Sequence, residues 1–126
     1  MENRTAETRT VTITFGADGI IVVRSRPGYP QNESDARENL VICRQLAGDK
    51  KAPVLVDVRQ MAPLTRQARE VYATEADFAL AQAMLVESAF TRISANLFIR
   101  VGRPVHPTRM FNSEDEAMQW LKGFLA

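Results

Sequence analysis

The most constraining feature of this chain is the short run Pro53–Val58, which is apolar at every position except Asp57. Its shortness and its β-branched composition are typical of a strand that is buried on both faces, as in the middle of a parallel sheet. Neighbouring parallel strands have to be joined by a crossover, which is usually a helix. The run therefore predicts an α/β fold.

An antiparallel hairpin is predicted ahead of this strand. Residues 10–15 alternate threonine with large apolar side chains, and residues 20–23 are apolar throughout. Between them, residues 16–19 read Gly-Ala-Asp-Gly, which suits a tight turn. Residues 1–8 are polar, so we interpret them as an N-terminal tail and residues 9–126 as a single domain.

Two helices have clear start signals. Asn32 or Ser34 can cap a helix that ends at Gly48, and apolar residues recur at helical spacing between them. Ser113 is followed three residues later by Glu116, which is the pattern of a capping box ahead of an apolar helix face. The chain is therefore expected to end in an amphipathic helix.

The segment after the central strand is predicted to hold two further helices. Thr65 is a plausible cap for a helix over residues 66–73, and Thr74 is a plausible cap for a second helix over residues 75–89. Asp77 follows Thr74 at the spacing of a second cap.

Strand composition returns near the end of the chain, where residues 93–101 predict a strand and residues 108–111 a short last one. The expected order of elements is ββαβααβ(β)α. This order corresponds to an α/β domain with a mixed four- to five-stranded sheet flanked by helices.

Charge and hydropathy exclude several classes of protein. Sixteen Lys and Arg nearly cancel fifteen Asp and Glu, and the net charge of +1 gives no broad field to attract nucleic acid. No apolar run is long enough to span a bilayer, and the polar start lacks the apolar stretch of a secretory signal. We therefore expect a cytoplasmic protein with no transmembrane segment and no nucleic-acid partner.

The sequence contains no visible catalytic constellation, because His106 is the only histidine and Cys43 the only cysteine. His106 lies in an expected loop, and Cys43 lies on the apolar face of an expected helix, where a core role is more common than a nucleophilic one. These residues do not make a soft-ligand metal site, and no glycine-rich nucleotide-binding loop occurs. We expect a non-enzymatic protein without metal or cofactor.

A charged cluster is predicted where two strands end. Asp57 and Arg59 end one predicted strand, and Arg100, Arg103 and His106 follow the end of another. Ligands of open α/β sheets bind beyond the carboxyl ends of parallel strands, so these side chains form a candidate anion site. The alternative is a set of exposed charges that contact only solvent.

The predicted helix over residues 75–89 carries more apolar surface than one core-facing stripe requires. We therefore expect it to contact the core, a second subunit or an apolar ligand. The candidate face is made of five side chains: Phe78, Leu80, Met84, Leu85 and Val86.

Several of these segments together resemble the STAS superfamily, which includes the anti-sigma-factor antagonists, and in particular its SpoIIAA-like branch of uncharacterised proteins. The resemblance rests on the leading hairpin, the apolar strand that ends at Asp57, the turn and helix after it, and the late segment 111–121. It implies a mixed sheet flanked by helices and a role in protein interaction or ligand binding. In the antagonists a phosphorylatable Ser of an Asp-Ser-Ser-Gly turn opens the helix after the central strand. Residues 61–65 lack that motif here, and Thr65 is the only hydroxyl in the matching place.

Two functional hypotheses stay open. The first is a regulatory protein-interaction module whose partner face, and candidate phosphorylation site, is the turn at Thr65. The second is a carrier or sensor of a small amphipathic anionic ligand, with its apolar tail beneath residues 78–86 and its head near Arg100 and Arg103. We also expect a homodimer or larger homo-oligomer, because two-fold association is the commonest way to cover an apolar helix face.

Overall fold

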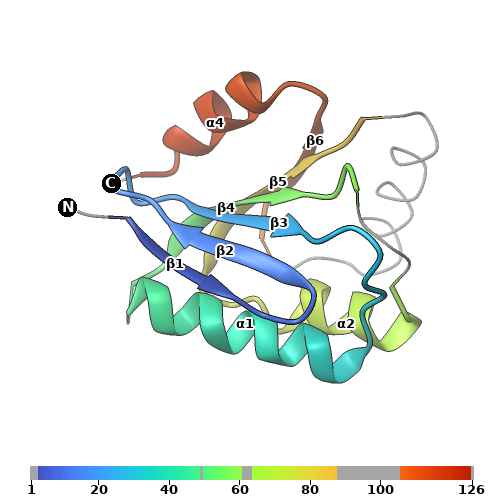
Figure 1. The fold of residues 1–126 in the computed structure, drawn as a ribbon. Helices are drawn as coiled ribbons and strands as arrows, with labels where there is room; N and C mark the ends of the chain where they lie inside the picture. Colours follow the sequence, from blue (N-terminus) through green and yellow to red (C-terminus); the bar gives the residue numbers. More distant parts are fainter. Residues whose placement is uncertain (1–2, 49, 61–63, 88–105, 126) are drawn as a thin grey trace.

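The computed structural model describes residues 3–48, 50–60, 64–87 and 106–125. They form a six-stranded sheet with helices on both faces (Figure 1). The strands are β1 (Arg4–Glu7), β2 (Val11–Phe15), β3 (Ile21–Ser25), β4 (Ala52–Asp57), β5 (Ala79–Leu85) and β6 (Thr108–Phe111). Their order across the sheet is the same as their order along the chain.

The sheet has an antiparallel half and a parallel half. Strands β1, β2 and β3 pair antiparallel, whereas β3, β4, β5 and β6 pair parallel. The β2–β3 hairpin turns at Gly19, whose φ of 89° is a conformation that favours glycine. In the parallel half Arg24 lies beside Asp57, and Asp57 lies beside Leu85. The carboxyl ends of these strands therefore meet at one edge of the sheet.

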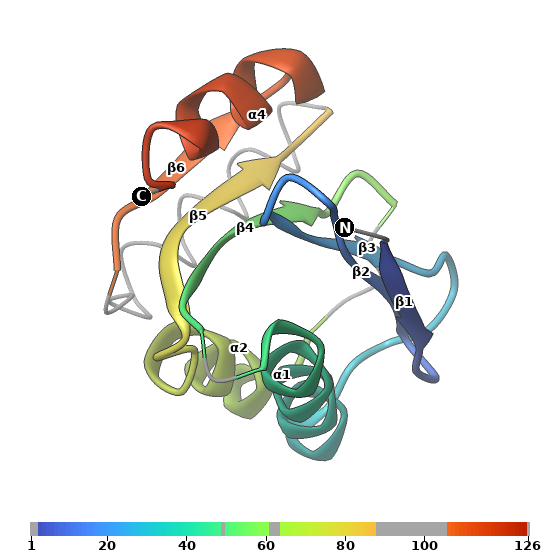
Figure 2. The ribbon, with the colours of Figure 1, turned by 90° about the vertical axis from the view of Figure 1, so that its left-hand side faces the viewer.

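The helices α1 (Glu33–Ala47) and α2 (Arg66–Thr74) lie together on one face of the sheet, and α4 (Glu114–Lys122) lies on the other (Figure 2). Each begins at a predicted cap. The side-chain oxygens of Asn32, Thr65 and Ser113 accept hydrogen bonds from backbone N–H groups in the first turns of α1, α2 and α4. These bonds satisfy donors that the helix itself leaves free.

The core consists of two layers, one on each face of the sheet. Val54 of β4 packs toward α1 and α2, and its neighbour Leu55 packs toward α4. Side chains of a strand alternate between the two faces, so β4 is buried on both. This confirms the central strand that the apolar run over Pro53–Val58 predicts.

The predicted helix over residues 75–89 is wrong. Residues Ala79–Leu85 form β5, which lies between β4 and β6. A strand that is buried on both faces is apolar at nearly every position, so it lacks the alternation that distinguishes a strand from an apolar helix. The hydroxyl of Thr74 donates to the carbonyl of Glu70 inside α2, so Thr74 lies at the end of one helix and does not open another.

The N-terminal segment also differs from the prediction. Arg4–Glu7 lies in the expected polar tail, but it pairs with β2 as an edge strand, and Arg4 donates to the carbonyl of Leu46 on α1. Polar and charged side chains are common on edge strands, where they discourage further pairing. Within the described residues the sheet therefore has six strands and not four to five.

Two strands are predicted near the end of the chain. The short last strand over residues 108–111 is confirmed as β6, whereas the predicted strand over residues 93–101 lies outside the described residues. Within the described ranges, none of the helices has the length and apolar character that crossing a bilayer requires.

Candidate functional site

An open cleft lies at the edge of the sheet where the parallel strands end. Its volume is about 770 Å³, which is within the usual range for small-molecule sites. Side chains from the ends of β3, β4, β5 and β6 and from the start of α4 line it. They are Arg24, Ser25, Asp57, Arg59, Gln60, Val86, Glu87, Asn112 and Glu114.

Asp57 is the most buried charged group of this cleft, with only 11% of its side chain exposed. Its carboxylate accepts two hydrogen bonds from the Arg59 side chain, at 3.0 and 2.8 Å, and one from Arg24 Nη1 at 2.9 Å. The backbone N–H of Arg59 adds a fourth bond at 3.1 Å. Asp57 therefore holds two arginine side chains in fixed positions.

These contacts set the charge of Asp57. Burial alone raises the pKa of a carboxyl group, but the hydrogen bonds from Arg59 and Arg24 outweigh it and hold the pKa of Asp57 below its ordinary value. The same bonds raise the pKa of the Arg59 guanidinium. Asp57 and Arg59 are therefore both charged at neutral pH.

Arg24 and Glu114 complete the cluster and were not among the residues that sequence reasoning placed here. The two guanidinium nitrogens Nη1 and Nη2 of Arg24 donate to the two carboxylate oxygens of Glu114, at 3.0 and 3.1 Å. The hydrogen bond to Glu114 is the main cause that raises the pKa of Arg24. A recognisable signal existed, because a parallel pairing of β3 with β4 puts Arg24 at the same sheet edge as Asp57.

The structure describes three of the five residues of the predicted anion site. Asp57 and Arg59 meet, whereas Arg100 and Arg103 lie outside the described residues. His106 is not part of the cleft, because its Nε2 lies 2.9 Å from Oε1 of Gln82. Gln82 is three residues before the end of β5, or about 10 Å from that sheet edge. The prediction placed His106 after a strand over residues 93–101, which lies outside the described residues. In the structure His106 lies just before β6, and the start of this parallel strand is at the end of the sheet opposite the cleft.

The predicted apolar face is part of the core. Met84, Leu85 and Val86 are buried in the sheet, as is Phe78, and Leu80 is half-buried. Their side chains project to both faces of β5 and do not form one surface. The prediction of a ligand or dimer face at these residues required them to lie on one side of a helix. Because they form a strand, they do not share one exposed face.

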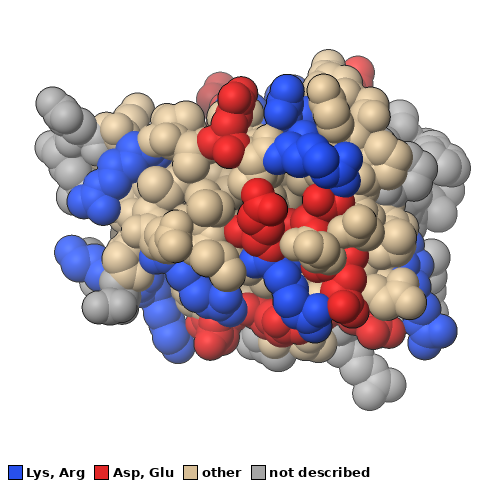
Figure 3. All heavy atoms as spheres, turned by 60° about the horizontal axis from the view of Figure 1, so that its bottom comes forward, with Lys and Arg blue, Asp and Glu red and all other residues tan. Residues whose placement is uncertain are grey.

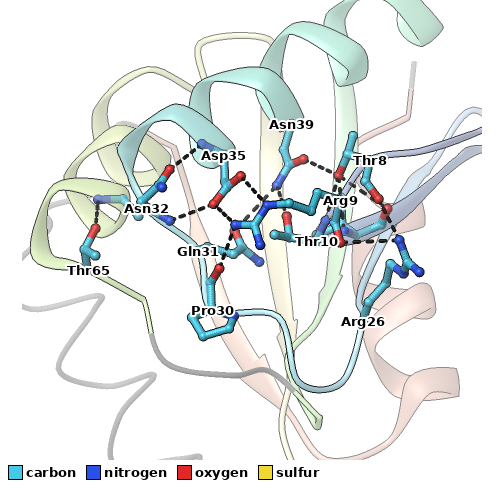
Figure 4. A network of polar contacts seen from close by, with 12 residues as sticks. Thr8, Arg9, Thr10, Arg26, Pro30, Gln31, Asn32, Asp35, Asn39 and Thr65 are labelled. Carbon is cyan, nitrogen blue, oxygen red and sulfur yellow. Dashed lines mark hydrogen bonds and ion pairs between the residues drawn. The ribbon is translucent and has the colours of Figure 1, made fainter.

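The turn at Thr65 forms a second candidate site. Thr65 is exposed, and its hydroxyl accepts the backbone N–H of Ala68 at 3.1 Å. The backbone N–H of Thr65 donates to the carbonyl of Gln31 at 3.0 Å, and Leu64 forms an isolated parallel bridge with Gln31. Because Gln31 precedes the cap Asn32, these bonds hold the starts of α1 and α2 beside each other (Figure 4).

A buried polar network lies beneath this pair of helix starts, with Asn39 of α1 at its centre (Figure 4). Asn39 accepts from the Thr8 hydroxyl at 2.7 Å and donates to the hydroxyls of Thr10 and Tyr72 at 3.0 and 2.8 Å. Tyr72 donates in turn to the side chain of Gln31. Burial raises the pKa of Tyr72, so its hydroxyl stays protonated as a donor. No local pattern in the sequence indicates this network.

The outer face around α1 and α2 carries interspersed acidic and basic side chains (Figure 3). Two arginines of α1 reach across to the end of α2, where Arg37 pairs with Glu75 and Arg44 with Asp77. The charges on this face therefore largely offset one another, in line with the absence of a broad field predicted from composition.

Cys43 lies in the core beneath the sheet, and burial raises the pKa of its thiol to about 12. A thiol with such a pKa is protonated at neutral pH and is a poor nucleophile. Among the described residues, no group of three His, Cys, Asp or Glu side chains could hold a metal ion.

Comparison with known proteins connects the chain to an uncharacterised family. The family model described as Domain of unknown function (DUF7793) matches residues 14–125. A protein with unknown function from Arthrobacter sp. FB24 is 32% identical, with 86% of this chain and 96% of that chain covered and a TM-score of 0.33. None of the curated proteins matches the chain.

A solved structure identifies the fold. An uncharacterised protein of the DUF3478 family from Shewanella loihica PV-4, described as having a SpoIIAA-like fold, is similar with a TM-score of 0.56. The match covers 94% of this chain and 91% of that chain at 10% sequence identity. The SpoIIAA-like fold implied by the sequence resemblance is therefore confirmed.

Proposed function

Because the chain belongs to the family described as Domain of unknown function (DUF7793) and has a SpoIIAA-like fold, we propose that it is a non-catalytic, regulatory protein-interaction module. One observation carries this proposal. The caps Asn32 and Thr65 stand beside each other at the starts of α1 and α2, joined by the bridge between Gln31 and Leu64. This rigid pair of helix starts is the proposed partner face.

The charge at the start of α2 favours an acidic partner. The first turn of α1 contains the acidic residues Glu33 and Asp35, which offset its positive helix end. The first turn of α2 contains no acidic residue, whereas Arg66 follows its cap directly and Arg69 lies three residues further on. The partner segment is therefore expected to carry carboxylates or a phosphate that approach Thr65 and these arginines.

Phosphorylation of Thr65 fits the same face as its regulatory step. A phosphate on the cap would lie at a positive helix end beside Arg66, so the fold should tolerate it. It would also place negative charge where the acidic partner docks, and like charges repel. Modification should therefore lower partner affinity without lowering the stability of the module.

The environments of the reactive side chains support a non-catalytic role. Cys43 is buried and protonated, and His106 contacts Gln82 in a different part of the molecule. Burial lowers the pKa of His106, which keeps its ring neutral, but no nucleophile among the described residues is hydrogen-bonded to it. Nucleophilic catalysis needs such a contact.

The carrier hypothesis is less well supported. It requires an apolar cavity beneath residues 78–86, and those residues form β5 or adjoin it inside the core. The expectation of a homo-oligomer was based on the same predicted helix, which the structure replaces with β5. The oligomeric state stays a prediction, and sedimentation at micromolar concentration tests it.

The experiment is site-specific photo-crosslinking in the cells that express the protein. Gln67 lies exposed in the first turn of α2, and Gln119 is an exposed glutamine of α4 on the other face. Each is replaced in turn by p-benzoylphenylalanine. We expect a discrete crosslinked protein from position 67 that is missing from position 119.

A second variant ties the crosslink to charge. Thr65→Asp keeps a good helix cap and adds the negative charge of the proposed modification. It should leave the melting temperature unchanged and remove the crosslink from position 67. A crosslink that persists in Thr65→Asp, or that is equal at both positions, contradicts the proposed face.

A further inference from the structure

The lining of the strand-end cleft is almost entirely polar, since Val86 is its only apolar member. A lipid tail gains nothing in such a cleft, because burying apolar surface is favourable only against an apolar wall. The cleft does present the side-chain amides of Gln60 and Asn112 and the hydroxyl of Ser25. These groups suit a small, strongly polar ligand.

The two arginines are held in place and still have donors to offer. Asp57 and Glu114 bind Arg59 and Arg24 through paired hydrogen bonds, which fixes both guanidinium planes. The nitrogens Nη1 of Arg59 and Nε of Arg24 take part in none of the hydrogen bonds among the described residues. Both side chains remain about 40% exposed. An anionic group of a ligand can therefore dock on donors that are already oriented.

The balance of charge argues against a simple anion. Beside Arg24 and Arg59, the lining includes three carboxylates, those of Asp57, Glu87 and Glu114. An anion alone would be repelled by the three carboxylates, and a cation alone would be repelled by the two guanidinium groups. A ligand that carries both signs satisfies both halves of the lining.

We propose that this cleft binds a small zwitterion with a carboxylate and an ammonium group, such as a free α-amino acid. The carboxylate accepts from Arg59 and Arg24, and the ammonium group donates to Glu87. Asp57 acts behind them as a positioning residue. This site is separate from the partner face at Thr65 and does not depend on it.

The test is a titration of the full chain with free L-amino acids, followed by amide NMR shifts and by melting temperature. Sodium acetate and methylammonium chloride serve as single-charge probes at the same ionic strength. We expect saturable shifts at Arg24, Arg59 and Glu87, and binding of at least one amino acid about ten-fold tighter than acetate, equivalent to one additional charged contact. A rise in melting temperature should accompany it by mass action.

Two variants separate the halves of the site, with Arg37→Gln as a control on an exposed arginine outside the cleft. Glu87→Gln should remove the preference for the amino acid over acetate, and Arg59→Gln should abolish the response to both. Glu87 is exposed, so its replacement keeps the test valid even if Arg59→Gln fails to fold. Equal binding of acetate and every amino acid, or no saturable shift with any probe, overturns the proposal.

Discussion

The molecule contains two polar clusters that differ in charge and in access to water. The network around Asn39 consists of neutral amides and hydroxyls, and its central side chain is 2% exposed. The cluster around Asp57 consists of four acidic and basic side chains joined by ion pairs, and it opens into a cleft. The first has nearly all its donors and acceptors satisfied inside the protein, whereas the second leaves donors facing solvent.

This difference indicates that one cluster stabilises the fold and that the other is available for binding. A buried neutral network is stable only when its members are paired, and pairing leaves no capacity for a ligand. A charged cluster at a cleft can be fixed by its internal ion pairs and still present free N–H groups. The Asn39 network therefore positions helix starts, and the Asp57 cluster is suited to contact other molecules.

The largest effect on stability is expected from Asn39→Leu, which keeps the branched shape of the side chain but removes every hydrogen bond at the centre of the network. Thr8, Thr10 and Tyr72 then lose buried partners, at a cost of about 3 kcal/mol in the free energy of unfolding. Chemical denaturation measures this. Tyr72→Phe, which removes one hydroxyl, should cost only about 1 kcal/mol. Equal costs for the two variants would show that Asn39 is not the centre.

A smaller effect is expected from Asp57→Asn, about 2 kcal/mol, because Arg24 and Arg59 lose a charged acceptor but are partly exposed to water. The pKa of Asp57 is lowered in the folded state, so its contribution is present above the unfolded pKa of about 3.9 and is lost as pH falls through the lower folded pKa. When the free energy of unfolding is measured between neutral pH and pH 3, it should therefore fall less steeply with decreasing pH for Asp57→Asn than for the wild type. Identical acid dependence in both proteins would remove Asp57 from this role.

The smallest effect is expected from Thr65→Ala, which removes the cap of α2 and should cost about 1 kcal/mol. Arg66→Ala, which breaks only the exposed pair with Glu70, is the matched control and should change stability by less than about 0.5 kcal/mol. The midpoint of urea unfolding distinguishes the two. A Thr65→Ala midpoint that coincides with that of Arg66→Ala would show that the cap is dispensable.

Local chemistry made much of the fold predictable. The caps Asn32, Thr65 and Ser113 act through backbone groups only a few residues away, so their signals can be read from short stretches of sequence. The central strand β4 was likewise evident from its β-branched residues. Strand β5 was not, because its alanines and Met84 have no β preference of their own, and only burial between two strands makes them extended.

The candidate sites were less predictable because they join residues far apart in the sequence. Asp57 and Arg59 are two positions apart, and both were assigned correctly to a strand end. Arg24 and Glu114 reach them only through the pairing of β3 with β4 and the docking of α4. The Asn39 network likewise depends on α1, α2 and the β1–β2 turn coming together, which no single segment specifies.

The order of the strands has a consequence for how the chain reaches its folded state. Because each strand pairs with the one before it, the sheet can grow from one side as the polypeptide leaves the ribosome. The β2–β3 hairpin needs only a short loop to close, whereas each later strand of the parallel half has to wait for an entire crossover segment. Synthesis and assembly of the six described strands therefore proceed in the same direction, and none of them has to be inserted between two that have already paired.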